Sequence, residues 1–322
     1  MKKLLVTYQI PQQGLDALRS DFDIIYPEKE MFSKEEIIER ISECEVLLTV
    51  FTQPIDKEVI GAGKQLKMIA NFGVGFNNID IAFATEQGIV VTNTPNAVCE
   101  PTAEMAMGLM LDVMRRISWC DRNLRQNPDF EWGLMKNLGS GPYGKTLGII
   151  GMGKIGKALA RRAIAFGMKI IYHKRTPLSS EAEKEFNATY VSMDELLKTA
   201  DVISLNCPLT DATHHLLSHP QFQLMKQGAY VINTARGPVI DEEAMVHYLK
   251  NGHLAGAGLD VFENEPTIHP ELLTLDNVAM TPHTGTGTVE TRIETAREAA
   301  ENIIRCFNGE KNISIVNPDV WR

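Results

Sequence analysis

The 322-residue sequence contains no apolar run that approaches the roughly 20 residues needed to span a lipid bilayer. Its five cysteines include no Cys-x-x-Cys pair, which argues against a disulfide framework and against a zinc site of that kind. Basic residues are outnumbered, 32 against 41 acidic ones, so that the formal net charge is −9. Such a surface repels phosphate-rich partners. These deficits predict a cytoplasmic protein that binds neither membranes nor nucleic acids.

Short apolar runs that alternate with helical patterns are, by contrast, abundant. A chain of this length is typical of about two domains, and the alternation predicts βαβ units with parallel sheets. Before residue 100 the predicted strands are residues 4–6, 24–26, 46–50, 68–70 and 89–91, and the predicted helices are residues 12–19, 34–41 and 79–87.

The same alternation starts again after residue 100. Residues 101–126 predict one long helix, residues 127–144 a loop rich in Gly and Asn, and residues 289–307 a final amphipathic helix. The predicted strands between the loop and the final helix are residues 147–150, 169–172, 202–205, 230–233, 257–259 and 278–280.

The segment TLGIIGMGKIG places Gly151, Gly153 and Gly156 in a Gly-x-Gly-x-x-Gly pattern, between a predicted strand and a helical pattern at 155–166. The first glycine permits a tight turn, the second lets backbone N–H groups approach a pyrophosphate, and the third permits close helix packing. A plain glycine turn is the alternative. The context favours a Rossmann unit that binds a dinucleotide at the helix N-terminus.

The next predicted strand ends in His173, Lys174 and Arg175. At this point NAD-binding proteins usually carry Asp or Glu, which binds the adenosine ribose hydroxyls. An acid would repel the 2′-phosphate of NADP, whereas Lys174 and Arg175 can form charge-assisted hydrogen bonds to it. A solvated basic loop is the alternative. The missing acid and the added cations both favour NADP.

Three later segments place polar side chains just beyond predicted strands. Arg236 follows one strand, Asp260 and Glu265 follow the next, and His283 follows the last. Because ligands of open α/β sheets bind at the carboxyl ends of strands, these residues are expected to face one crevice.

In this order the segments resemble the motifs of the D-isomer-specific 2-hydroxyacid dehydrogenase family, and the sequence is most similar to the glyoxylate/hydroxypyruvate reductase branch. The motifs are Gly73-Val74-Gly75, the Gly151 fingerprint and residues 233–237, 260–266 and 282–283. The resemblance implies an α/β fold with two Rossmann-like or flavodoxin-like doubly wound parallel-sheet domains and a cleft between them. It implies a substrate domain of residues 1–100 plus 288–322, a dinucleotide-binding domain of residues 101–287, and a homodimer formed through the cofactor domain.

The resemblance also implies roles that suit the reduction of a 2-keto acid. Arg236 would bind the substrate carboxylate, His283 would exchange a proton with the carbonyl oxygen, and Glu265 would orient His283. Asp260 would be a partner of the nicotinamide ring. The other implied contacts are Thr102, Lys154, Ile155, Cys207, Pro208, Thr234, Ala235 and Gly285 for the cofactor, and Phe51, Thr52 and the backbone N–H groups of Val74 and Gly75 for the substrate.

The sequence therefore predicts an NADPH-preferring reductase that converts small 2-keto acids to D-2-hydroxy acids, with NAD(H) as the alternative cofactor. A dehydrogenase for a bulkier 2-keto acid and an NAD(P)-binding sensor or corepressor on the same fold stay open. A formate-type dehydrogenase is disfavoured because that branch has Gln in place of Glu265. Trp132 is expected to reach a substrate site, its own or a neighbouring subunit's, or to pack its loop. No metal is expected, since adjacent His214 and His215 lack the spacing of ligands on one face.

Overall fold

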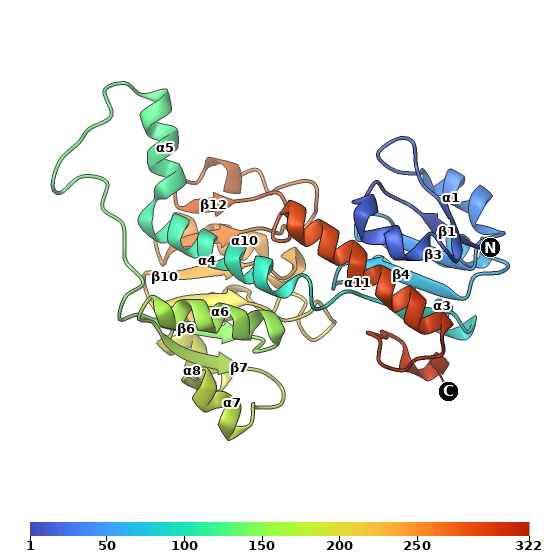
Figure 1. Cartoon of the computed structure of the whole chain (residues 1–322). Coiled ribbons are helices and arrows are strands. Elements are labelled where there is room, and N and C mark those ends of the chain that lie inside the picture. The colour runs from blue at the N-terminus through green and yellow to red at the C-terminus, as the bar shows by residue number, and fades with distance from the viewer. Residues whose placement is uncertain (322) are drawn as a thin grey trace. The chain divides into compact units, whose positions relative to one another are not determined.

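The computed structural model describes residues 1–321, and the chain divides into two units (Figure 1). One unit comprises Met1–Val98 and the chain from Gly287 onward, and the other comprises Cys99–Thr286. The sequence predicted breaks near residues 100 and 288. Each unit is built on one sheet of parallel strands with helices on both faces, which confirms the predicted fold class.

The sheet of the first unit has the strand order β2-β1-β3-β4-β5. Two of its internal strands, β3 and β4, are buried at every position, as expected for strands covered on both faces. Apolar side chains of η1 and α11 pack on one face, and those of α1, α2 and α3 pack on the other. The elements are β1 Lys2–Val6, η1 Gln12–Leu18, β2 Phe22–Ile25, α1 Lys34–Ile41, β3 Val46–Val50, α2 Lys57–Ala62, β4 Met68–Phe72, α3 Ile81–Glu86, β5 Val90–Thr92, α11 Val289–Phe307 and η4 Pro318–Trp321.

The predicted α-helix at residues 12–19 is instead the 3₁₀-helix η1. Pro11 precedes it and supplies no side-chain cap, so that little favours a regular α-helix there. Packing against α11 holds the segment in place: a Cβ atom on Gly14 would lie 2.3 Å from the Cβ of Ala296. Tertiary contact therefore decides its conformation.

The sheet of the second unit has the order β12-β11-β10-β9-β6-β7-β8. The strand order reverses between β6 and β9, and such a switch point is where open α/β sheets bind ligands. Helices α4 and α6 pack on one face, and α8, α9 and α10 on the other. The elements are α4 Cys99–Arg115, α5 Ile117–Gln126, β6 Thr146–Ile150, α6 Lys154–Ala165, β7 Lys169–His173, α7 Ser180–Glu185, β8 Ala188–Tyr190, α8 Met193–Thr199, β9 Val202–Leu205, α9 His219–Leu224, β10 Ala229–Asn233, η2 Gly237–Val239, α10 Glu242–Lys250, β11 Leu254–Leu259, η3 Leu272–Thr274 and β12 Val278–Met280.

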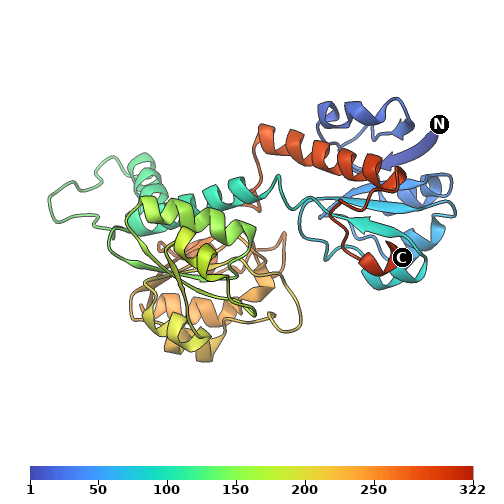
Figure 2. The same cartoon turned by 60° about the horizontal axis from the view of Figure 1, so that its bottom comes forward.

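The single helix predicted at residues 101–126 is wrong, because the chain breaks at Arg116 into α4 and α5. Arg116 has a left-handed backbone (φ 58°) and its guanidinium lies 3.7 Å from the centre of the Trp119 ring. The Asp112 carboxylate accepts the Ser118 N–H at 2.6 Å and so caps the new helix. Helix α5 has no buried residue, and with the loop that follows it extends away from the sheet of its unit (Figures 1 and 2).

No helix among residues 1–321 is long and apolar enough to cross a membrane.

Candidate active site

The glycine turn between β6 and α6 has the geometry that a pyrophosphate requires. Gly151 has φ 96°, and a Cβ there would lie 2.6 Å from the carbonyl oxygen of Asn206. A Cβ on Gly156 would lie 2.5 Å from the carbonyl oxygen of Gly151, whereas a Cβ on Gly153 would meet no atom within 4 Å. The turn is therefore tight, the helix lies close to it, and open space remains at the second glycine.

Polar atoms at the carboxyl edge of the same sheet also suit a nucleotide. The Oγ1 of Thr234 and the Oδ1 of Asn206 are buried without a hydrogen-bond partner among the described residues. Cys207 packs on the Gly151 turn, with its backbone nitrogen 2.8 Å from the position of an added Cβ. Burial raises the pKa of the Cys207 thiol to about 11, so that it is a neutral surface at pH 7. With the open space at Gly153, these residues fit a nicotinamide dinucleotide.

At the basic end of β7, one side chain makes contacts within its own unit, and the next two cations in the chain form no ion pair with any described residue. The Nδ1 of His173 lies 3.0 Å from the carbonyl oxygen of Val191, and its ring stacks on Tyr190. Lys174 is half-buried and Arg175 is exposed. Within residues 1–321 neither Lys174 nor Arg175 forms an ion pair, although the chain has an excess of carboxylates. Two unpaired cations thus remain beside the nucleotide turn.

His283 and Glu265 form the central pair of the site. The Nδ1 of His283 lies 2.8 Å from Oε2 of Glu265, whose Oε1 accepts the Phe262 N–H at 2.9 Å. Burial favours a higher pKa for Glu265, but the hydrogen bond and charge of His283, with smaller effects of the Phe262 N–H and Arg236, lower the pKa below its ordinary value. The structure thus brings together two residues that lie in different predicted segments of the sequence.

Arg236 lies directly after β10, on the wall of a cavity of about 450 Å³. Its Nη1 donates to the Ala235 carbonyl at 2.7 Å, and Asn233 Nδ2 donates to the Arg236 carbonyl at 3.0 Å. Burial lowers the pKa of Arg236, and the Glu265 carboxylate partly offsets this effect. The cavity is lined by Arg236, Gly237, Pro238, Phe262, Glu263, Asn264 and Glu265.

Gly237 lets the two walls of this cavity meet. A Cβ on Gly237 would lie 1.9 Å from the carbonyl oxygen of Phe262 and 2.4 Å from the nitrogen of Glu263. Because no other residue could occupy this position without moving the 262–263 backbone, the glycine after Arg236 keeps Arg236 and Glu265 in one cavity.

Asp260 anchors the loop that carries His283. Its buried carboxylate accepts the Thr281 hydroxyl at 2.6 Å, the Thr284 N–H at 2.7 Å and the Gly285 N–H at 2.8 Å. Its carbonyl accepts the His283 N–H at 2.8 Å. Asp260 therefore bonds His283, which has a left-handed backbone (φ 53°), and residues on both sides of it in the chain. Nothing in the sequence patterns indicated this structural role.

The predicted cofactor residues Thr102 and Gly285 lie close together. A Cβ on Gly285 would lie 2.8 Å from Asp260 Oδ2 and 3.9 Å from Thr102 Cγ2. Lys154 and Ile155 begin α6, Pro208 follows β9, and Ala235 follows β10, so these residues lie at the carboxyl edge of the sheet as expected.

The predicted substrate residues of the first unit follow two internal strands of its own sheet. Phe51 and Thr52 come after β3, and Val74 and Gly75 come after β4. Asn71 Nδ2 donates to the carbonyls of Gly73 (3.0 Å) and Gly75 (2.8 Å), which fixes this loop. Among the described residues, the N–H groups of Val74 and Gly75 have no acceptor. Asn71 was not predicted from the sequence, although a polar residue near the end of an apolar strand could have indicated it.

Comparison with known proteins agrees with this geometry. Residues 107–285 match the family described as D-isomer specific 2-hydroxyacid dehydrogenase, NAD binding domain. A glyoxylate reductase of Thermococcus onnurineus is 42% identical, over 99% of this chain and 96% of its own. The crystal structure of a glyoxylate reductase from Paecilomyes thermophila shares 37% identity and a TM-score of 0.88, covering 98% of both chains.

The structure of an NADPH-dependent glyoxylate/hydroxypyruvate reductase from Sinorhizobium meliloti has a TM-score of 0.87 with 30% identity, again over 98% of both chains. The family resemblance predicted from the motifs is thereby confirmed. The chain belongs to the D-isomer-specific 2-hydroxyacid dehydrogenase family and is an NAD(P)-dependent enzyme of that family.

Proposed function

We propose that this enzyme reduces small 2-keto acids, such as glyoxylate and hydroxypyruvate, to D-2-hydroxy acids and prefers NADPH to NADH. The observation that carries the proposal is Glu265, which bonds His283 and lines one cavity with Arg236. Relatives that are glyoxylate reductases support a small substrate. The unpaired Lys174 and Arg175 support NADPH.

In the proposed mechanism each residue of the site has one task. Arg236 binds the substrate carboxylate through its planar guanidinium, and the N–H groups of Val74 and Gly75 also donate to it. When bound, the reduced nicotinamide would supply the hydride that the keto carbon receives. His283 donates a proton to the keto oxygen, so that the ketone becomes a hydroxyl group. The Glu265 carboxylate stabilises the imidazolium before transfer and holds the ring in position.

The remaining assignments follow from the same proposal. The first unit is the substrate domain, with Phe51 and Thr52 in its pocket, and the second is the dinucleotide domain. The Gly153 turn and the start of α6 bind the pyrophosphate. Asp260 holds the loop that carries His283 and Gly285, and it would be the partner of the nicotinamide ring. The five cysteines are free thiols, which supports the proposed cytoplasmic location.

Steady-state oxidation of NADPH and NADH with glyoxylate, hydroxypyruvate, pyruvate and phenylpyruvate tests this function. We expect the highest kcat/KM for NADPH with glyoxylate or hydroxypyruvate. A preference for phenylpyruvate would favour the dehydrogenase for bulkier acids. Tight NADPH binding with negligible turnover of every keto acid would favour the sensor or corepressor.

Arg175→Ala is expected to weaken NADPH binding by about 1.5–3 kcal/mol, the range for hydrogen bonds to charged groups. NADH lacks the 2′-phosphate, so its dissociation constant should barely change. Fluorescence titration of both cofactors measures the two values. Lys169→Ala is the matched control, because Lys169 is an exposed cation at the opposite end of the same strand. Equal losses for NADPH and NADH would remove Arg175 from the phosphate site.

We further propose that the enzyme is a homodimer formed through α5 and the 127–144 loop of the cofactor domain. Helix α4 is largely buried against its own unit, whereas α5 and the loop expose an unusual number of large apolar side chains. A monomer rarely exposes such a group without a partner. The exposed set is Ile117, Leu124, Trp132, Leu134, Met135, Leu138 and Tyr143.

Trp132→Asp combined with Leu134→Asp should convert the dimer to a monomer, because two buried, unpaired charges would be placed in its apolar interface. Light scattering should show the mass fall from about twice 35.9 kDa to that of one chain. Leu273→Asp, a change at an exposed leucine elsewhere in the same unit, should leave the dimer intact. A wild-type monomer would contradict the proposal.

A further inference from the structure

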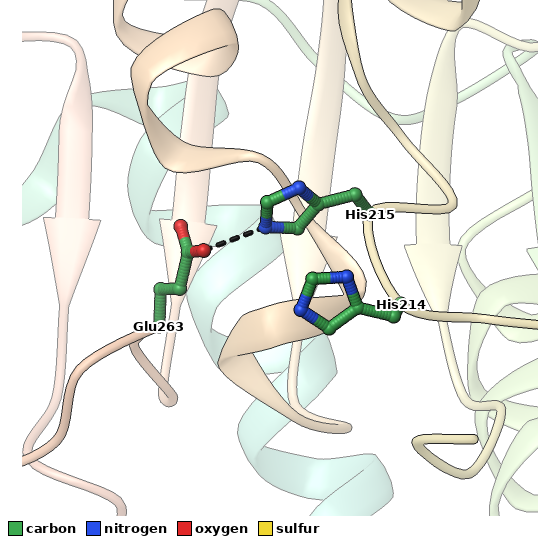
Figure 3. A group of neighbouring side chains, drawn as sticks. All are labelled: His214, His215 and Glu263. Carbon is green, nitrogen blue, oxygen red and sulfur yellow. Dashed lines mark hydrogen bonds and ion pairs between the residues drawn. The ribbon is translucent and has the colours of Figure 1, made fainter. Parts of the chain in front are cut away.

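His214, His215 and Glu263 form a cluster that the proposed reaction does not use (Figure 3). The ring Nε2 of His215 lies 2.6 Å from Oε1 of Glu263, and the two imidazole rings stack with their centres 4.1 Å apart. One ligand atom from each of the three residues lies within 4.8 Å of the other two. The two histidines come from the segment after β9, and Glu263 comes from the segment after β11.

The backbone of His215 explains how two adjacent histidines reach the same side. Neighbouring residues of an extended chain point to opposite faces. His215 instead has a left-handed backbone (φ 48°), which is uncommon for a residue other than glycine. Its N–H donates to the Pro238 carbonyl at 2.8 Å, and the His214 N–H donates to the Thr210 carbonyl at 2.9 Å. The contacts that hold this conformation keep both rings facing Glu263 (Figure 3).

The carboxylate is held in place from behind. Oε2 of Glu263 accepts the Glu242 N–H at 3.3 Å, and Oε1 of Glu242 accepts the Glu263 N–H at 2.7 Å. Such outer contacts commonly orient metal ligands. The side chains of His215 and Glu263 are half-buried, and His214 is exposed, which gives an ion access from solvent.

We propose that His214, His215 and Glu263 bind one divalent transition-metal ion of the zinc class. Two imidazole nitrogens and one carboxylate oxygen are ligands typical of Zn²⁺, with water in the remaining position. With metal–ligand bonds of about 2.0–2.2 Å, ligand atoms of a tetrahedral site lie roughly 3.3 Å apart. Binding of the ion would therefore move the ligand atoms of His215 and Glu263 apart by less than 1 Å. It would bring the two most distant ligand atoms of the cluster together by at most about 1.5 Å. The ion displaces the proton that the His215–Glu263 hydrogen bond holds.

This proposal replaces the expectation, drawn from sequence spacing, that the adjacent histidines form no metal site. It does not depend on the proposed reaction. Glu263 nevertheless lines the cavity that contains Arg236 and Glu265, so the ion would sit against the wall of that cavity.

Titration of the full-length wild-type protein with Co²⁺, followed by visible absorption, and competition with Zn²⁺ test the site. We expect one ion per chain, displacement of Co²⁺ by Zn²⁺ and no displacement by Mg²⁺. His214→Gln should lower the affinity for Zn²⁺ about tenfold or more. The His214 ring is exposed and has no hydrogen-bond partner among the described residues, so we expect this change to leave the fold intact.

Glu263→Gln provides the second variant, because its amide oxygen can still accept the Glu242 N–H while the charged ligand is lost. It should reduce Zn²⁺ affinity as strongly as His214→Gln does. His219→Gln is the matched control, since His219 is an exposed histidine whose ring packs against His247 and Tyr248 with no carboxylate. The proposal is overturned if wild-type protein gives no Co²⁺ spectrum, if His214→Gln binds like wild type, or if His219→Gln causes an equal loss.

Discussion

Replacing His283 with alanine should lower kcat for keto-acid reduction by about 10²- to 10⁴-fold, the range that a positioned acid or base contributes. The loss arises because no other group then supplies the proton to the keto oxygen. His283 takes part in the proposed proton transfer and not in the proposed phosphate sites, so the affinity for NADPH should stay nearly unchanged. Stopped-flow reduction of glyoxylate and a separate NADPH titration measure the two quantities.

A second variant is needed because His283 has a left-handed backbone. Alanine is strained at φ 53°, whereas asparagine tolerates this conformation. His283→Asn should therefore fold as well as wild type and show a similar loss of kcat. His219→Ala, at an exposed histidine of the same unit, serves as the control. If His283→Asn kept kcat within about tenfold of wild type, another acid would have to supply the proton.

The variant Glu265→Gln separates the effect of the Glu265 charge from the effect of its hydrogen bond on the position of the His283 ring. Glutamine can still accept the His283 N–H, but it cannot stabilise the imidazolium by charge. We expect kcat to fall less than in His283→Ala, since the proton donor remains in place.

Replacing Arg236 with alanine should raise the activation free energy for glyoxylate reduction by about 2–5 kcal/mol. This change corresponds to a roughly 30- to 5,000-fold lower kcat/KM. The reason is that the substrate carboxylate would enter a half-buried site without its cation. Arg236→Lys keeps a charge but loses the planar fork, so its kcat/KM should lie between those of wild type and alanine.

A substrate without a carboxylate isolates this interaction. Glycolaldehyde has the size of glyoxylate but no negative charge, so wild type and Arg236→Ala should reduce it at similar, low rates. The comparison is a double-mutant cycle in which the substrate carries the second change. Equal losses with glyoxylate and glycolaldehyde would indicate that Arg236 supports the fold of the site and not the carboxylate.

Patterns within short segments were sufficient to predict most of the fold and to nominate residues for the candidate site. Gly151, Gly153 and Gly156 could be interpreted because each performs its task within one strand–turn–helix unit. Arg236, Glu265 and His283 could be found because parallel strands all present their carboxyl ends at one edge. Strand β8, only three residues long and mostly exposed, had too weak a pattern to be recognised.

Other features depend on contacts between distant residues. The break at Arg116 depends on the Asp112 cap and the Trp119 ring, so a continuous helical pattern did not show it. Asp260 follows β11, but the three donors that its carboxylate accepts lie at residues 281–285. His214 and His215 share one side because Pro238 and the rest of the loop support a left-handed residue, contrary to the expectation from their spacing.

Local patterning therefore accounts for the class of fold, the dinucleotide turn and the choice of candidate reacting groups. These depend on residue type and on spacings of a few residues, which the chain records directly. The tertiary structure accounts for which carboxylate bonds His283, which cations at the end of β7 stay unpaired, and which histidines face Glu263. Such contacts, and their absence, depend on segments that are far apart in the chain. Only packing of the sheet edge brings the side chains of these segments within hydrogen-bond distance.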